Sequence, residues 1–234
     1  MLTVVPSSAG DAVQASEGLT LQGPQRGGAL GDLWSDWSEH YRARGIDPDT
    51  ITRDGPADEL VYREAKPRIV FVLKDSNAWP GHSLTEAMVP RPFRMMIMVA
   101  RWSHGLLHDF PALESADDPA NQIAAIRQVA AVNLKKRTGA ATAVAQDIEA
   151  FAFQDQALLL RQLLELQPEI LVACGTWGPL TRLLALSPEP GSRMVRDSHT
   201  GALVLAFRHP ARCGRLRSYE RLKGLIEHAR AANV

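Results

Sequence analysis

Four polar side chains that suit catalysis stand just after short apolar runs of this 234-residue chain. They are Asp75, Asn77, Asn133 and His209. A carboxylate, a carboxamide and an imidazole together suit the cleavage of an N-glycosidic bond. The carboxylate stabilises a cationic sugar or directs water, the imidazole stabilises charge on the leaving base, and the amide reads the edge of that base.

The apolar runs are typical of strands that are buried on both faces. The run 68–73 is rich in β-branched residues, and similar runs stand at 129–133, 169–174 and 202–207. Strands that alternate with helices at this spacing form a mostly parallel sheet with helices on both faces. Such sheets bind ligands at the carboxyl ends of their strands. We therefore expect an α/β fold whose four-stranded sheet gathers the polar side chains at one rim.

Asp75 and Asn77 have a simpler interpretation, because an isolated Asp-x-Asn after a strand more often caps a turn or the next helix. The polar residues after two further strands favour a site instead. Trp79 lies in the loop after Asn77, and Phe93 follows two prolines at the start of a predicted helix. Either ring can stack on a bound base or simply pack into the core.

The first 29 residues are rich in Gly, Ser, Gln and Ala and lack hydrophobic patterning, which predicts a flexible or loosely packed segment. From Leu30 onward, apolar residues recur at helical spacing until Gly45. The remaining helices are expected within 93–128, 147–166, 179–186 and 219–231. We therefore expect one domain over residues 30–234.

Charge is distributed unevenly although the formal net charge is zero. Residues 1–60 hold 4 Lys or Arg against 10 Asp or Glu, a net of 4 − 10 = −6. Residues 193–234 hold 9 basic residues, eight of them Arg, against 3 acidic ones, a net of 9 − 3 = +6. Arginine suits bidentate contact with phosphate, although a solvated helix face also explains part of the excess.

Several classes of site are absent from the sequence. The chain has two cysteines, Cys174 and Cys213, too few for a disulfide scaffold or a four-thiolate metal site. It has no HExxH, no Walker loop and no GxGxxG, so no metal or cofactor is predicted. No segment reaches the length of a membrane span and no signal sequence is evident, which predicts a cytoplasmic protein.

Five pieces of the chain, in their order, resemble the uracil-DNA glycosylase superfamily, and most closely its bacterial families. The resemblance covers roughly residues 66–217. The pieces are Val72-Leu-Lys-Asp-Ser-Asn77, Pro90-Arg-Pro-Phe93, Asn133-Leu-Lys-Lys136, Pro168-Glu-Ile-Leu-Val-Ala-Cys-Gly175 and His209-Pro-Ala211. The order of the five is far more specific than any one of them.

The resemblance implies a three-layer α/β/α domain and a monofunctional DNA glycosylase that flips a base out of DNA and acts as a monomer. It implies that Asp75 and His209 are catalytic and that Asn133 and Phe93 bind the base, with Asn77 and Trp79 beside them. The basic loop after His209 is expected to contact DNA. In this loop, Arg212, Arg215 and Arg217 are expected to contact phosphates, and Leu216 is expected to act as a wedge. Lys135, outside the loop, is a further expected DNA contact.

Two departures from the superfamily bear on the substrate. Two cysteines exclude the iron–sulfur cluster that some bacterial families carry. Asn77 stands where the uracil-specific enzymes have a tyrosine that rejects bases substituted at C5, so a C5 substituent becomes tolerable. The substrate is therefore open between uracil and a C5-modified pyrimidine, such as hydroxymethylated or glucosylated cytosine of phage DNA. Asn133 does not decide between them, because an amide presents either a donor or an acceptor.

The sequence also leaves open the biological role and two other classes of function. Excision of uracil would serve base-excision repair, whereas excision of modified phage bases would serve defence. A catalytically inactive relative that only binds nucleic acid is the main alternative. An enzyme that cleaves free nucleosides is a weaker one, because the arginine-rich loop favours a polymer.

Overall fold

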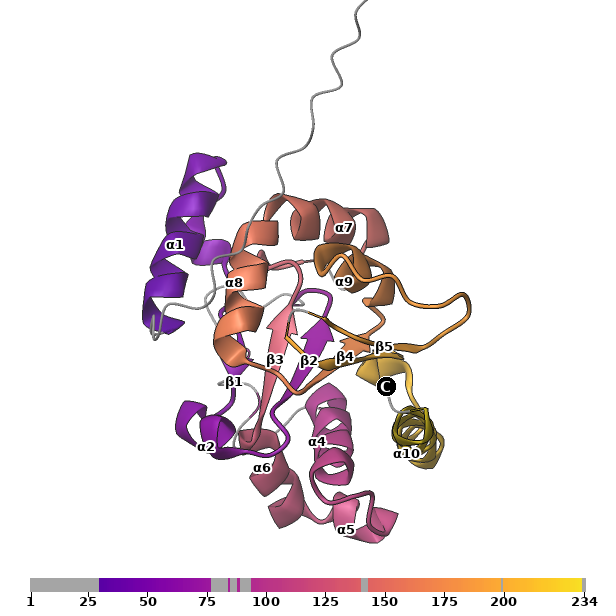
Figure 1. The fold of residues 1–234 in the computed structure, drawn as a ribbon. Helices are drawn as coiled ribbons and strands as arrows, with labels where there is room; N and C mark the ends of the chain where they lie inside the picture. The colour runs from indigo at the N-terminus through magenta and orange to yellow at the C-terminus, as the bar shows by residue number, and fades with distance from the viewer. Residues whose placement is uncertain are drawn as a thin grey trace, which may run out of the picture.

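A mixed six-stranded sheet forms the centre of the described part of the protein, with the order β1-β3-β2-β4-β6-β5 (Figure 1). The computed structural model describes residues 30–76, 84, 88, 94–139, 143–198 and 200–232. The strands are β1 (Gly55–Pro56), β2 (Ile69–Leu73), β3 (Val129–Asn133), β4 (Ile170–Cys174), β5 (Met194–Arg196) and β6 (Leu203–Phe207).

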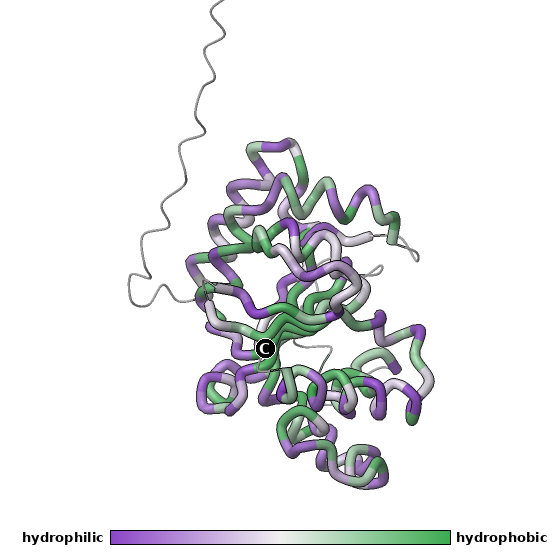
Figure 2. The backbone as a smooth tube through the Cα atoms, turned by 45° about the vertical axis from the view of Figure 1, so that its right-hand side comes forward, coloured by the Kyte–Doolittle hydropathy of each residue, from purple (hydrophilic) through white to green (hydrophobic). Residues whose placement is uncertain are grey.

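The four predicted strands are present and run parallel to one another. In the order β3, β2, β4, β6 each pairs with the next in parallel register, and Leu73 lies opposite Asn133 while Cys174 lies opposite Phe207. Nearly all their side chains are buried, as expected for strands covered on both faces. Figure 2 shows these strands as a hydrophobic bundle in the middle of the fold.

The prediction of a four-stranded sheet was wrong, because two short antiparallel strands extend the sheet at its edges. β1 pairs with β3, and β5 pairs with β6. β1 consists of Gly55 and Pro56, both poor strand formers, and β5 spans three residues. Elements this short hold too few residues for a detectable period of two.

Helices cover both faces of the sheet, as the alternation of strands and helices predicted (Figure 1). Val70 and Val72 of β2 enter one core, whereas Ile69, Phe71 and Leu73 enter the other. Residues on the first face come from α1 (Leu30–Ala43), α2 (Glu59–Glu64), α7 (Ala145–Gln154), α8 (Gln156–Leu166) and α9 (Trp177–Leu183). Those on the second come from α4 (Arg94–Leu107), α5 (Leu113–Asp117), α6 (Pro119–Arg127) and α10 (Arg215–Ala231).

The predicted helical stripe of α1 is confirmed as core packing, because Leu33, Trp37 and Tyr41 are fully buried. Two 3-10 turns, η1 (Pro48–Thr50) and η2 (Pro210–Arg212), complete the described elements. No helix in the described ranges combines the length and apolarity that crossing a bilayer needs.

Candidate functional site

The parallel register brings the polar ends of three strands to one rim of the sheet. The ladder between β2 and β3 continues past the strands, where the Leu134 and Lys135 amides donate to the Leu73 and Lys74 carbonyls at 3.0 Å each. Asp75 therefore follows β2 immediately beside the end of β3. On the other side of β2, the Gly175 amide donates to the Phe207 carbonyl at 2.8 Å, which fixes the ends of β4 and β6 together.

Asp75 is a largely buried carboxylate with lysines on either side of it. Its side chain is 8 % exposed, and its Oδ2 lies 3.9 Å from Nζ of Lys135. Burial raises the pKa of Asp75, while the charges of Lys135 and Lys74 act in the opposite direction and Asp147 adds to the rise. Burial has the larger effect, so the pKa of Asp75 stays above its usual value although both lysines favour the ionised form.

A glycine lets the loop after β3 close over Asp75. The Gly139 amide donates to the Ser76 carbonyl at 2.8 Å. A Cβ atom at position 139 would lie 2.0 Å from Oδ2 of Asp75, far inside van der Waals contact. Any other residue at this position must displace the carboxylate or the loop. Gly139 was not identified from the sequence, because only the close approach of two loops gives it a role.

Asn133 at the same rim has a buried acceptor without a partner among the described residues. The side chain donates through Nδ2 to Oγ of Ser76 at 3.1 Å, and its Oδ1 has no hydrogen-bond partner among the described residues. Asn133 as a whole is 1 % exposed. A buried carbonyl oxygen without a donor costs about 1–3 kcal/mol. An arrangement that accepts this cost is typical of a site whose partner arrives with a ligand.

A buried ion pair between Asp54 and Lys136 contacts the backbone of Asn133. Both carboxylate oxygens of Asp54 lie 2.8 Å from Nζ of Lys136, and neither side chain is exposed. Asp54 also accepts from the Asn133 amide and from Nε2 of Gln162, each at 2.8 Å. The Lys136 ammonium lies between 5 and 6 Å from the ring centres of Trp34 and Trp37, at 5.7 and 5.4 Å. Burial lowers the pKa of Lys136, and Asp54 counteracts that change.

His209 follows β6 and begins the turn η2. Its Nδ1 accepts a hydrogen bond from the Ala211 amide at 3.4 Å, which leaves Nε2 as the protonated nitrogen of the neutral ring. Burial lowers the pKa of His209, and the charges of Lys74 and Arg212 lower it further. His209 is therefore a neutral imidazole at physiological pH that can donate through Nε2.

Gly175 forms the turn after β4 and lies beside both Lys74 and His209. Its φ of +71° is a left-handed conformation that favours glycine. A Cβ atom there would lie 3.5 Å from Cε of Lys74 and 3.6 Å from Cβ of His209, so the two side chains approach the same turn. Lys74 was missed by the sequence prediction, although a lysine directly before Asp75 at a strand end was a visible signal.

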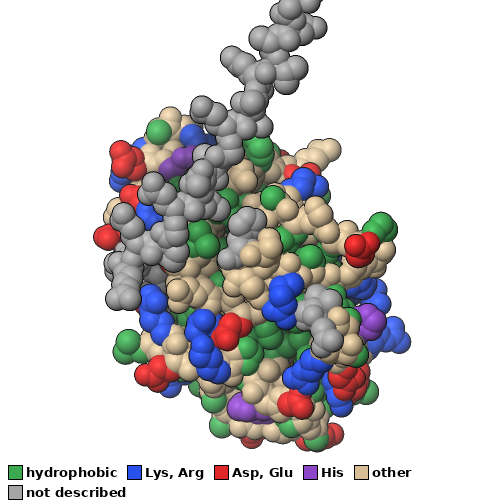
Figure 3. Space-filling model, viewed as in Figure 1, with side chains coloured by type: hydrophobic (Ala, Val, Ile, Leu, Met, Phe, Trp, Pro, Cys, Tyr) green, Lys and Arg blue, Asp and Glu red, His purple; other side chains and the backbone are tan. Residues whose placement is uncertain are grey.

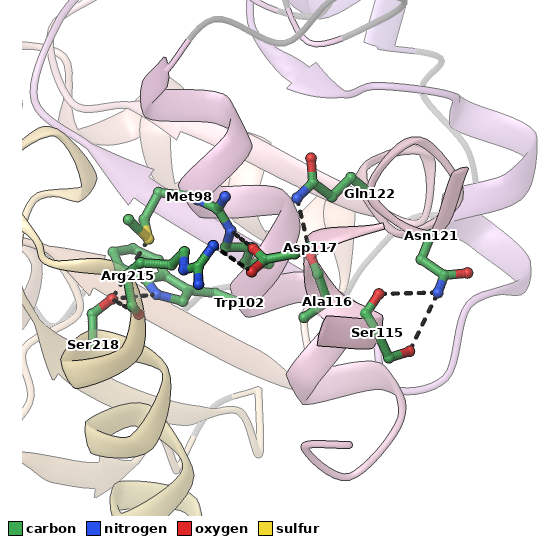
Figure 4. A network of polar contacts seen from close by, with 10 residues as sticks. Met98, Trp102, Ser115, Ala116, Asp117, Asn121, Gln122, Arg215 and Ser218 are labelled. Carbon is green, nitrogen blue, oxygen red and sulfur yellow. Dashed lines mark hydrogen bonds and ion pairs between the residues drawn. The ribbon is translucent and has the colours of Figure 1, made fainter. Parts of the chain in front are cut away.

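The predicted basic loop is partly helical, so the prediction of its extent was wrong. α10 begins at Arg215 instead of Tyr219, because the extended Gly214 already acts as its N-cap. Leu216 in this first turn is 58 % exposed. Figure 4 shows Arg215 directed at Asp117 of α5, 2.9 Å away. The same view shows Ser218 joined to Trp102 of α4.

The predicted DNA-contacting residues differ in their surroundings. Arg212 and Arg217 are exposed. Arg215 shares Asp117 with Arg101 of α4. Lys135 is not on the outer surface, since it is buried against the ring of Phe151 with its charge toward Asp75. Figure 3 shows Lys and Arg side chains, mixed with acidic ones, on the side of the molecule where α10 lies.

Three predicted base-binding residues, Asn77, Trp79 and Phe93, lie outside the described residues, as do residues 1–29. Among the residues that are described, no three His, Cys, Asp or Glu side chains are grouped as metal ligands. A surface hollow between α7 and α9, lined by Phe153, Pro179 and others, contains none of the predicted site residues.

Comparison with known proteins gives no family for this chain. No family model matches the sequence, and no curated protein matches it at a significant level.

Proposed function

We propose that this protein is a monofunctional DNA glycosylase that resembles the uracil-DNA glycosylase superfamily. It would flip a pyrimidine out of DNA and hydrolyse its N-glycosidic bond, which leaves an abasic site. The observation that supports the proposal is that a buried carboxylate, Asp75, and an Asn133 amide oxygen without a partner among the described residues lie at the rim where β6 also ends before His209. A buried carboxylate, an amide oxygen and a neutral imidazole are groups that suit cleavage of an N-glycosidic bond.

In the proposed mechanism each group acts on one part of the nucleotide. The bond between C1′ and the base breaks with its electrons moving to the base, so the sugar becomes cationic and the base anionic. Asp75 stabilises the sugar cation and directs water to C1′, while Nε2–H of His209 donates to the base oxygen that gains charge. Oδ1 of Asn133 accepts an N–H from the base edge. Water supplies the hydroxyl at C1′, and its proton leaves with the base.

The proposed substrate is uracil or a pyrimidine modified at C5, because Asn77 replaces the tyrosine that excludes C5 substituents in the uracil-specific enzymes that this chain resembles. An N–H that Oδ1 of Asn133 can accept is present on both kinds of base, at N3 of uracil and at N4 of cytosine. The role would be base-excision repair in the first case and defence against phage with modified DNA in the second.

The test is formation of abasic sites in matched single- and double-stranded DNAs that carry uracil, thymine, hydroxymethylcytosine or glucosylated hydroxymethylcytosine. We expect excision from at least one DNA by the native protein, and none by Asp75→Asn or His209→Ala. Asp109→Asn serves as the control, since this exposed carboxylate pairs with Arg230 on α10. The control variant should act like the native protein.

Two results would contradict the proposal. Excision at the native rate by Asp75→Asn would remove the mechanism. Strongly salt-dependent DNA binding without abasic product on any of the four bases would indicate the alternative, a binding protein that lacks catalysis.

A further inference from the structure

The stem of Lys74 lies beside Gly175, close to one of the two residues that we assign to catalysis. Lys74 directly precedes Asp75, and its stem lies against the position where Gly175 lacks a side chain. Two atoms of His209, the backbone nitrogen and Cβ, also lie near this position, each 3.6 Å from where a Cβ of residue 175 would stand. Both Asp75 and His209 lie within range of the Lys74 charge.

We propose that Lys74 is a further catalytic residue, whose ammonium group stabilises the negative charge that develops on the departing base. This inference rests on the proposed glycosylase function and adds the group that balances charge on the leaving-group side. The assignment follows from the position of the Lys74 stem, whose Cε lies beside Gly175 where the backbone nitrogen and Cβ of His209 also approach.

The charges of the site explain why such a group is needed. His209 is neutral, so it offers the leaving base a hydrogen bond but no full charge. The other charged groups that act on these two residues are Lys135 on the far side of Asp75, Asp147 of α7, and Arg212 in η2. Lys74 is the cation among them that acts on both Asp75 and His209. A fixed ammonium in a largely buried site stabilises an anion far more than it would in water.

The test compares bases that leave with different ease. Single-turnover excision would be measured for Lys74→Met, Lys74→Arg and the native protein on uracil and 5-fluorouracil, and on 5-hydroxymethylcytosine and 5-formylcytosine. Fluorine and the formyl group withdraw electrons and so stabilise the departing anion without help from the protein. Lys66→Met is the matched control, because Lys66 is an exposed lysine at the opposite end of β2 that pairs with Glu169.

We expect Lys74→Met to excise the unactivated base, uracil or 5-hydroxymethylcytosine, about 100-fold more slowly than the native protein does. The loss should be clearly smaller on the activated base, and Lys74→Arg should recover part of the rate. The acid limb of the pH–rate profile should also move. Removal of the Lys74 charge raises the pKa of both Asp75 and His209, so the active ionisation state is lost at a higher pH than in the native protein.

Three results would overturn the assignment, and they can be told apart. Native rates for Lys74→Met on both bases of a pair would remove Lys74 from catalysis while leaving the glycosylase proposal in place. Equal losses on both bases, with a shallower salt dependence of DNA binding, would instead make Lys74 a phosphate contact. No excision by the native protein on any of the DNAs would overturn both proposals together. Circular dichroism and thermal unfolding would verify that each variant is folded.

Discussion

Replacement of Lys136 by methionine is the most direct test of the structure beneath the site. Lys136 and Asp54 form an ion pair with no exposed side-chain surface, at 2.8 Å from Nζ to each carboxylate oxygen. Methionine has a similar length and preserves contact with the rings of Trp34 and Trp37. The substitution therefore removes the charge and its hydrogen bonds but little of the packing.

The expected loss of unfolding free energy is about 3–5 kcal/mol, the cost of leaving one member of a buried ion pair without its partner. The Asn133 amide and Gln162 still donate to the Asp54 carboxylate, so its two remaining hydrogen bonds place the loss toward the lower end of that range. A loss of this size is a large fraction of the roughly 5–15 kcal/mol that stabilises a typical domain.

A second substitution should restore much of the stability. With Asp54→Asn added, the new amide can still accept from the backbone of Asn133 through its oxygen. Its NH2 group can donate to Oε1 of Gln162, which has no partner in the described structure, once that amide turns over. The double variant should therefore lose less unfolding free energy than Lys136→Met alone. It should still be less stable than the native protein, because the removed ion pair carried several hydrogen bonds.

Urea denaturation followed by circular dichroism measures these differences, and equal slopes would show that the denatured states are comparable. If Lys136→Met is as stable as the native protein, the buried Asp54 carboxylate does not depend on Lys136 for its stability, and the reasoning is refuted. A double variant that loses the sum of the two single losses would refute the coupling between Lys136 and Asp54.

Three further predictions concern the rim itself. Asp75→Asn should abolish excision but leave the melting temperature unchanged or higher. Burial raises the pKa of Asp75, so the stability contributed by its neutral form is lost as the pH rises through that pKa. A neutral amide avoids this loss at pH 7. Gly139→Ala should fold but excise poorly, since its methyl group would meet the carboxylate; normal kinetics would mean that the loop moves aside freely. Arg212→Gln and Arg217→Gln should each lower the salt slope of DNA binding by about 0.9, and an unchanged slope would exclude a phosphate contact.

The sequence predicted the elements whose signal is local and long enough to detect. Each of the four parallel strands is a continuous apolar run, and Asp75, Asn133 and His209 follow them at the rim, as the topology of parallel sheets requires. The helical stripe of α1 was equally visible. These features depend on residues close together in the chain, so pattern and composition suffice.

The residues that support the site were missed because their roles depend on contacts across the chain. Asp54 stands in a polar loop, and only folding brings it to Lys136, 82 residues later. Gly139 matters because the Asp75 carboxylate approaches it too closely for a side chain, which the sequence does not display. Arg215 stays a predicted phosphate contact, and its ion pair with Asp117 on a separate helix was likewise not visible in the sequence.

The two short strands at the margins of the sheet also have a consequence for the solubility of the folded chain. The inner strands consist almost entirely of buried apolar residues, and an unpaired strand of this kind readily pairs with a copy from another molecule. β1 ends one margin after two residues, one of them a proline that offers no N–H, and β5 ends the other after three. Each margin is thus too short to serve as a template for intermolecular β-pairing.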